Sequence, residues 1–139
     1  MSNKNQRWQY YDLLKVVPAI VVVIVIFYFS SLNNPYPTKP SNNRLLILNP
    51  MLHIFEFGTL TFLVFFGLYP KVKIRFLIAF SILYAFFDEI HQIFVPYRYF
   101  DIFDLNFDTV GIILGYLAYM IFDLIKERFR NNNGIPDET

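Results

Sequence analysis

Residues 16–32 read VVPAIVVVIVIFYFSSL, a run with no charged side chain. An α-helix rises about 1.5 Å per residue, so this run covers roughly 26 Å, close to the ~30 Å thickness of the hydrocarbon core of a bilayer. Its one proline, Pro18, lies near the start, where a helix tolerates proline best. No small-x-small cleavage site follows Leu32, so we expect a retained membrane helix and not a removable signal peptide.

Three further apolar runs follow the first. They extend from about Leu45 to Leu68, where Asn49-Pro50 interrupts the run near its start, from Ile74 to about Val95, and from Val110 to Leu124. The chain of 139 residues is 55% hydrophobic, above the ~45–50% that is usual for soluble domains. We therefore predict an all-α polytopic membrane protein, with four transmembrane helices in residues 1–126 and a disordered cytoplasmic tail over residues 127–139.

The basic residues indicate how the predicted spans are oriented. Nine of the twelve lie before the first run, between the second and third, or after the fourth: Lys4, Arg7, Lys15, Lys71, Lys73, Arg75, Lys126, Arg128 and Arg130. Only Lys39, Arg44 and Arg98 lie in the two remaining loops. Because Lys and Arg are enriched in cytoplasmic loops, this alternation predicts that both termini are cytoplasmic.

Composition excludes several classes of function. The net charge is +1, and no basic patch is interleaved with stacking residues, so we expect no nucleic-acid partner. The absence of cysteine excludes disulfides, thiolate zinc sites and a cysteine nucleophile. Histidines and carboxylates are residue types that bind Zn, Mn or Ca. However, His-x-x-Glu with Glu-x-His is not a recognised zinc spacing, so we predict neither a metal nor a cofactor.

The predicted topology gathers polar residues near the outer side of the membrane. The candidate site residues there are His53, Glu56, Asp88, Glu89, His91, Gln92, Arg98, Asp104 and Asp108. His53 and Glu56 are three residues apart and share a helix face. Ionisable groups at membrane depth are costly, so such a cluster is a functional-site hypothesis by default. In the fourth run, Gly111-x-x-x-Gly115 is a small-residue pattern that predicts close helix packing.

Four motifs carry a family resemblance. They read His53-x-x-Glu56, then Asp88-Glu89-x-His91-Gln92-x-Phe94-Val95-Pro96-x-Arg98, then Asp101-x-x-Asp104, then Asp108-x-x-Gly111-x-x-x-Gly115. In these motifs the chain resembles the VanZ-like family of small bacterial membrane proteins, over roughly residues 10–125. Tyr97 departs from the family, which usually has glycine before the arginine. Met51-Leu52 stand where the family often has an Asp-Lys pair.

The resemblance implies a multi-pass protein of the bacterial cytoplasmic membrane. The family takes its name from an accessory gene of glycopeptide-resistance clusters, associated with teicoplanin resistance. The activity of the family at the molecular level is not established, so the resemblance leaves open whether the chain is an enzyme.

Three hypotheses remain for the polar residues. In the first, they recognise or modify a lipid-linked envelope component, a peptidoglycan precursor or a glycopeptide. Arg98 would then clamp a phosphate or carboxylate, with Gln92, His91, Asp104 and Asp108 as further binding residues. Asp88, Glu89, His53 and Glu56 would be the catalytic candidates.

In the second hypothesis the same residues form a structural network within the membrane. Arg98 would pair with Asp101 or Glu89, and His53 with Glu56 or Asp88, because buried charges require partners. In the third, the chain is a small lipid or solute transporter or flippase, whose carboxylates and histidines relay protons. Four spans are few for a transporter, so this hypothesis requires an oligomer.

Overall fold

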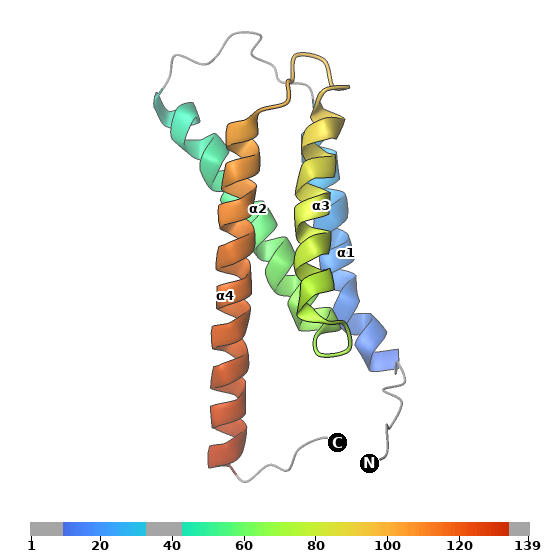
Figure 1. Cartoon of the computed structure of the whole chain (residues 1–139), viewed down its shortest axis with the longest axis vertical. Coiled ribbons are helices and arrows are strands. Elements are labelled where there is room, and N and C mark those ends of the chain that lie inside the picture. Colours follow the sequence, from blue (N-terminus) through green and yellow to red (C-terminus); the bar gives the residue numbers. More distant parts are fainter. Residues whose placement is uncertain (1–9, 33–42, 134–139) are drawn as a thin grey trace.

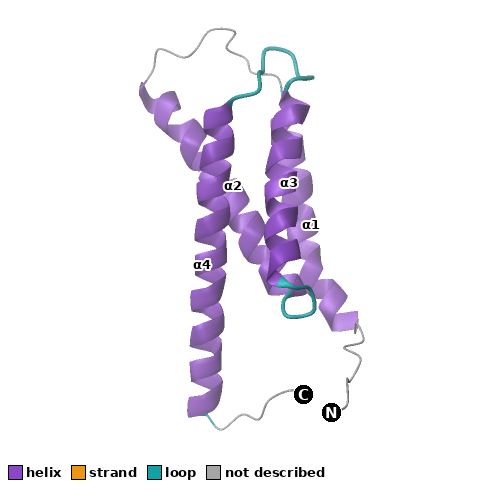
Figure 2. Cartoon of the chain, viewed as in Figure 1, coloured by secondary structure: helices purple, strands orange, loops and turns teal. Residues whose placement is uncertain are grey.

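The computed structural model describes residues 10–32 and 43–133, and within them the chain is helical with no β-strand (Figures 1 and 2). The four helices are α1 (Tyr10–Ser30), α2 (Asn43–Leu68), α3 (Ile74–Gln92) and α4 (Ile102–Asn132). The all-α prediction is therefore confirmed.

Helix α2 is the centre of the packing. It makes its most extensive contact with α4, followed by α1 and then α3. Its buried positions, Phe57, Leu60, Thr61, Val64 and Phe65, recur with the i, i+3, i+4, i+7 spacing of one helix face. The other helices complete this core with Ile26 of α1, Leu77 and Ala85 of α3, and Ile112 and Tyr119 of α4.

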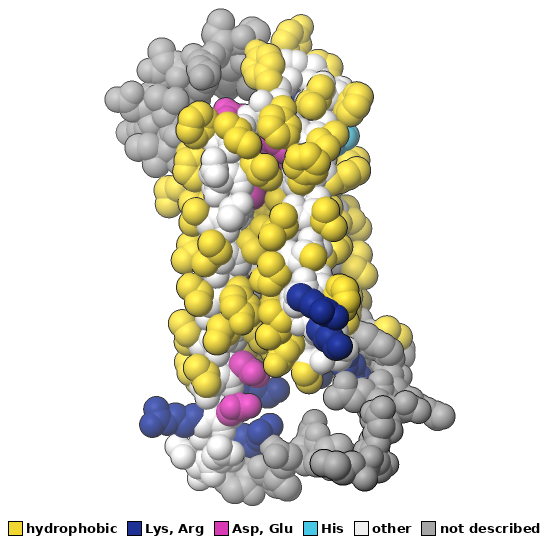
Figure 3. Space-filling model, viewed as in Figure 1, with side chains coloured by type: hydrophobic (Ala, Val, Ile, Leu, Met, Phe, Trp, Pro, Cys, Tyr) yellow, Lys and Arg dark blue, Asp and Glu magenta, His cyan; other side chains and the backbone are white. Residues whose placement is uncertain are grey.

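The outer surface of the bundle is apolar, as is typical of proteins that lie in a membrane. Large apolar side chains cover most of the face drawn in Figure 3, on the outside of the bundle as well as in its core. Three helical stretches among the described residues are long and apolar enough to cross a bilayer: Leu13–Ser30, Pro50–Leu68 and Ile102–Asn132. Helix α3 is not among them, because its 19 residues include Arg75, Asp88 and Glu89.

Two helices are longer than the sequence predicts. Asn49-Pro50 does not interrupt α2, which continues through Pro50; membrane helices tolerate proline where neighbouring groups satisfy the freed carbonyl. Helix α4 begins at Ile102 instead of Val110, because the carboxylate of Asp101 accepts the N–H of Phe103 at 2.9 Å and caps the helix.

The C-terminal end of α4 also differs from expectation. The helix continues to Asn132, into the segment expected to form a disordered tail from residue 127. Lys126, Glu127 and Arg128 are good helix formers, which favours this extension. Residues 134–139, the rest of the predicted tail, lie outside the described part of the chain.

Glycines set the close approach of α2 and α4. A Cβ added to Gly115 would overlap the backbone carbonyl of Gly58, and one added to Gly111 would meet the carbonyl of Ile54. The Gly111-x-x-x-Gly115 face of α4 therefore lies directly against the backbone of α2. This contact matters for the site, because it holds the beginning of α4 beside the beginning of α2.

The two ends of the bundle differ in charge. The end of α1, the end of α3 and the start of α4 lie together at the upper end in Figure 1. On the face drawn in Figure 3, the Lys and Arg side chains gather toward the opposite end. The candidate site residues therefore occupy the end of the bundle that is remote from this basic cluster.

Candidate functional site

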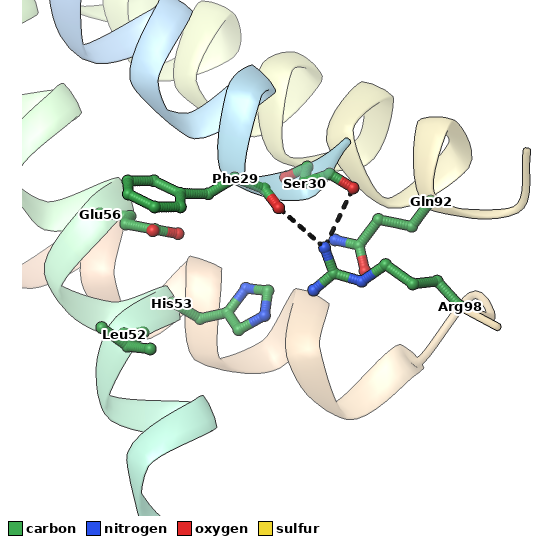
Figure 4. Close-up of a pocket in the computed structure, with 7 residues that line it drawn as sticks. All are labelled: Phe29, Ser30, Leu52, His53, Glu56, Gln92 and Arg98. Atoms are coloured by element: carbon green, nitrogen blue, oxygen red, sulfur yellow. Dashed lines mark hydrogen bonds between the residues drawn. The ribbon is translucent and has the colours of Figure 1, made fainter. Parts of the chain in front are cut away.

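A cavity of about 250 Å³ opens among the helices at the upper end of the bundle (Figure 4). Its walls come from three helices and a loop: Phe29 and Ser30 end α1, Leu52, His53 and Glu56 belong to α2, Gln92 ends α3, and Arg98 lies in the loop that follows. Four of the nine candidate residues thus line one space, namely His53, Glu56, Gln92 and Arg98.

Arg98 is held against the end of α1. Its Nη1 donates hydrogen bonds to the backbone carbonyls of Phe29 at 3.2 Å and Ser30 at 3.0 Å (Figure 4). The last carbonyls of a helix have no partner within the helix, and a cation there also complements the helix dipole. The hypothesis that Arg98 pairs with Asp101 or Glu89 is wrong, because its guanidinium forms hydrogen bonds with the carbonyls of α1 instead.

His53 is fixed by α4. Its Nδ1 lies 2.8 Å from Oδ1 of Asp108, and its Nε2 lies 3.6 Å from Oδ2 of Asp104. Both His53 and Asp108 are almost fully buried, with 6% and 1% of their surface exposed. The pairing of His53 with Glu56 or Asp88 is therefore wrong. The glycine contact between α2 and α4 explains the difference, since it brings Asp108 within reach of the imidazole.

Asp88 lies behind the wall of the cavity. Its Oδ2 accepts hydrogen bonds from Oγ of Ser30 at 2.8 Å and from Nε2 of Gln92 at 3.2 Å. Its other oxygen, Oδ1, is buried and has no hydrogen-bond partner among the residues that the structure describes. Asp88 thus positions two residues that line the cavity, Ser30 and Gln92, and is not itself exposed to it.

Glu89 and His91 do not line the cavity. Glu89 is fully buried, and its Oε1 accepts the backbone N–H of Asp101 at 2.6 Å. His91 stacks on the ring of Phe27, with 4.5 Å between ring centroids, and its Nε2 lies 3.0 Å from Oγ of Ser31. Both residues tie α3 to neighbouring segments.

The chain matches one known protein family. Residues 15–123 match the family model VanZ/LLP1, which covers more than half of the chain and includes all nine candidates. The chain belongs to the VanZ/LLP1 family. No curated protein and no solved structure matches it.

The loop between α3 and α4 forms a tight turn at Tyr97, the position where this VanZ/LLP1 protein departs from the family pattern. Tyr97, in place of the usual glycine, has a φ of 65°, in the region where non-glycine residues are uncommon. The N–H of the next residue, Arg98, bonds to the carbonyl of Val95 at 3.1 Å. The turn that aims Arg98 at α1 is thus formed without the glycine.

The end of α1 is the part of the site that the sequence did not predict. Phe29 and Ser30 form one wall, and Ser30 and Ser31 supply hydroxyls to Asp88 and His91. The signal available was the pair Ser30-Ser31, two small hydroxyl side chains at the end of a long apolar run. The role of these two serines depends on which helices pack against the end of α1, and the sequence alone does not predict that packing.

The carboxylates and histidines of the VanZ/LLP1 site form separate contacts with different partners. Within residues 10–32 and 43–133, no group of three or more His, Asp or Glu side chains is placed to hold a metal ion. The cavity itself presents one guanidinium, one imidazole and one carboxylate, from Arg98, His53 and Glu56. Such a set can bind a charged group and orient a proton donor or acceptor beside it.

Proposed function

We propose that this VanZ/LLP1 protein crosses the bacterial cytoplasmic membrane four times, with both termini in the cytoplasm, and recognises a charged group of a cell-envelope component at its outer face. The ligand in this proposal is a lipid-linked or peptidoglycan precursor that carries a phosphate or carboxylate. Residues 1–126 would form the membrane domain, in which α3 buries Asp88 and Glu89 within the bundle and presents apolar side chains such as Leu83 to the outside.

The observation that carries the proposal is the position of Arg98. One edge of its guanidinium is fixed by the carbonyls of Phe29 and Ser30, so the side chain is held in one orientation. Its Nη2 and Nε make no hydrogen bond with any residue that the structure describes. A guanidinium anchored in this way offers its remaining donors to an anion with little entropic cost.

The surroundings of the cavity favour a ligand that comes from the membrane. Phe29 and Leu52 line it, and each has 52% of its surface exposed on the apolar exterior of the bundle. A lipid could therefore place its headgroup against Arg98 while its chain remains in the bilayer. The positive-inside pattern of the basic residues supports an outward position for this end of the molecule.

Modification of the ligand is a narrower form of the same proposal. His53 lines the cavity and is oriented by Asp108, as a general acid or base must be. Accessory teicoplanin tolerance would be a consequence of binding or altering an envelope precursor. The structural-network hypothesis is favoured for Asp88, Glu89 and His91, which do not line the cavity and whose contacts are made to the protein itself.

The test is the thermal stability of the purified, detergent-solubilised protein with and without undecaprenyl phosphate. Ligand at a hundred times its Kd stabilises the folded state by about 2.7 kcal/mol, so the melting midpoint of the wild type should rise. Arg98→Lys should lose most of this rise, because lysine cannot hold the two carbonyls and a phosphate in the same planar geometry.

Two controls make this result specific. The uncharged alcohol undecaprenol should leave the wild-type midpoint unchanged, and Glu127→Gln, on the exposed far end of α4, should respond to the phosphate as the wild type does. An equal rise for wild type and Arg98→Lys, or no rise for either, would contradict the proposal.

A further inference from the structure

Two charged side chains of opposite sign, Glu56 and Arg98, line the cavity without an ion pair to any residue that the structure describes. Glu56 is half-buried and makes no hydrogen bond or ion pair with any residue that the structure describes. Arg98 uses only Nη1 in its contacts with α1. In Figure 4 the carboxylate of Glu56 and the guanidinium of Arg98 lie on opposite sides of the cavity, so they face the same space without bonding to each other.

The other polar side chains of the cavity already have partners. His53 is bonded to Asp108, Gln92 donates to Asp88, and Ser30 donates to Asp88. The charged groups that the walls leave available to a ligand are therefore one carboxylate and one edge of a guanidinium. The free carboxylate of Glu56 would repel a ligand that carries only a negative charge. The two groups together are therefore more specific than a simple anion site.

The position of Glu56 favours a cationic partner. A carboxylate among apolar groups such as Phe29 and Leu52 is costly unless it is paired. Five further carboxylates belong to the same end of the bundle, those of Asp88, Glu89, Asp101, Asp104 and Asp108. Within the described cavity Arg98 is the one Lys or Arg residue, and it is bound to α1. A positive group from outside would balance this excess of negative charge.

We infer that the ligand is a zwitterion, with an ammonium group beside Glu56 and a phosphate or carboxylate on Arg98. This inference rests on the proposed function and names the chemical class of its ligand. The volume of about 250 Å³ is below the roughly 300–1,000 Å³ of pockets for drug-sized molecules. It suits a small headgroup of the aminoalkyl phosphate type, with any acyl chain outside the cavity.

The experiment measures the affinity of the detergent-solubilised full chain for three probes. Dihexanoyl phosphatidylethanolamine carries both charges on a lipid, dihexanoyl phosphatidylglycerol carries only the anion, and free phosphoethanolamine carries both charges without a lipid. The wild type should bind the phosphatidylethanolamine about tenfold more tightly than the phosphatidylglycerol, which corresponds to about 1.4 kcal/mol.

The decisive variant is Glu56→Gln, which removes the charge but keeps the shape. It should bring the affinity for the phosphatidylethanolamine down to that for the phosphatidylglycerol, and the latter should stay unchanged or improve. Its melting midpoint should match that of the wild type, because Glu56 has no partner in the described protein to lose. Glu127→Gln serves as the matched control and should retain the preference.

The outcomes separate this inference from the proposed function. Equal affinity of the wild type for the two lipids, or a preference that survives in Glu56→Gln, overturns the zwitterion inference alone. Failure to bind the phosphatidylethanolamine also overturns it, and the proposed function then stands if Arg98 is still required for undecaprenyl phosphate. Binding of free phosphoethanolamine as tight as that of the lipid supports the zwitterion and identifies a soluble ligand as its source.

Discussion

Glu56 and Glu89 are both glutamates at the same end of the bundle, but they contact different groups. Glu56 faces the cavity with no partner among the described residues, whereas Glu89 is fully buried and accepts the N–H of Asp101 at 2.6 Å. Asp101 in turn caps α4. At the scale of single residues, Glu89 therefore belongs to the scaffold and Glu56 to the proposed ligand site.

Substitution of Glu89 tests this distinction. Glu89→Ala leaves a buried backbone N–H without its acceptor, so we expect it to lower the free energy of unfolding by about 1–3 kcal/mol. Glu89→Gln keeps a carbonyl oxygen as the acceptor and should cost less. Melting midpoints in detergent measure both effects. A Glu89→Gln protein with the wild-type midpoint but no response to undecaprenyl phosphate would instead place Glu89 in the binding site.

At the scale of helices, the sequence predicted the elements better than their partners. The apolar runs, the distribution of charge and the turn residues were enough to predict an all-helical membrane protein with its polar residues at one end. The pairing of His53 with Asp108 was not predictable, because it depends on the backbone contact of Gly58 with Gly115. The role of Phe29 and Ser30 likewise depends on where Arg98 lies in space.

The contact between α2 and α4 gives a prediction at this scale. In an isolated helix Gly→Ala is favourable by about 1 kcal/mol. Gly115→Ala should nevertheless lower the free energy of unfolding, by about 1–3 kcal/mol, because the added Cβ overlaps the carbonyl of Gly58 and forces the helices apart. It should also weaken ligand binding, since the separation withdraws Asp108 from His53.

A matched variant lies three residues further along the same helix. Ala118 is exposed, so Ala118→Leu adds more volume than Gly115→Ala but has no backbone in its way. Its melting midpoint should stay close to that of the wild type. If Gly115→Ala is as stable as Ala118→Leu, the close approach of α2 and α4 is not important for the fold.

At the scale of the whole molecule, the proposal requires one end of the bundle to face outward. The chain contains no cysteine, so a single introduced cysteine gives an unambiguous label. Tyr99, in the loop before α4, and Lys73, in the turn before α3, are both exposed and lie at opposite ends of the bundle (Figure 1). A membrane-impermeant maleimide should label Tyr99→Cys in intact spheroplasts, and Lys73→Cys only after permeabilisation. The reverse pattern would place the cavity on the cytoplasmic side.

The most direct test of the central claim is native mass spectrometry of the protein released from its own membrane. If the cavity holds an envelope lipid through Arg98, the wild type should retain one lipid molecule whose mass includes a phosphate, and Glu127→Gln should retain it equally. Arg98→Lys, at the same folded yield, should lose most of this adduct. Equal occupancy of the adduct in the wild type and Arg98→Lys would show that Arg98 does not hold the lipid and would contradict the account.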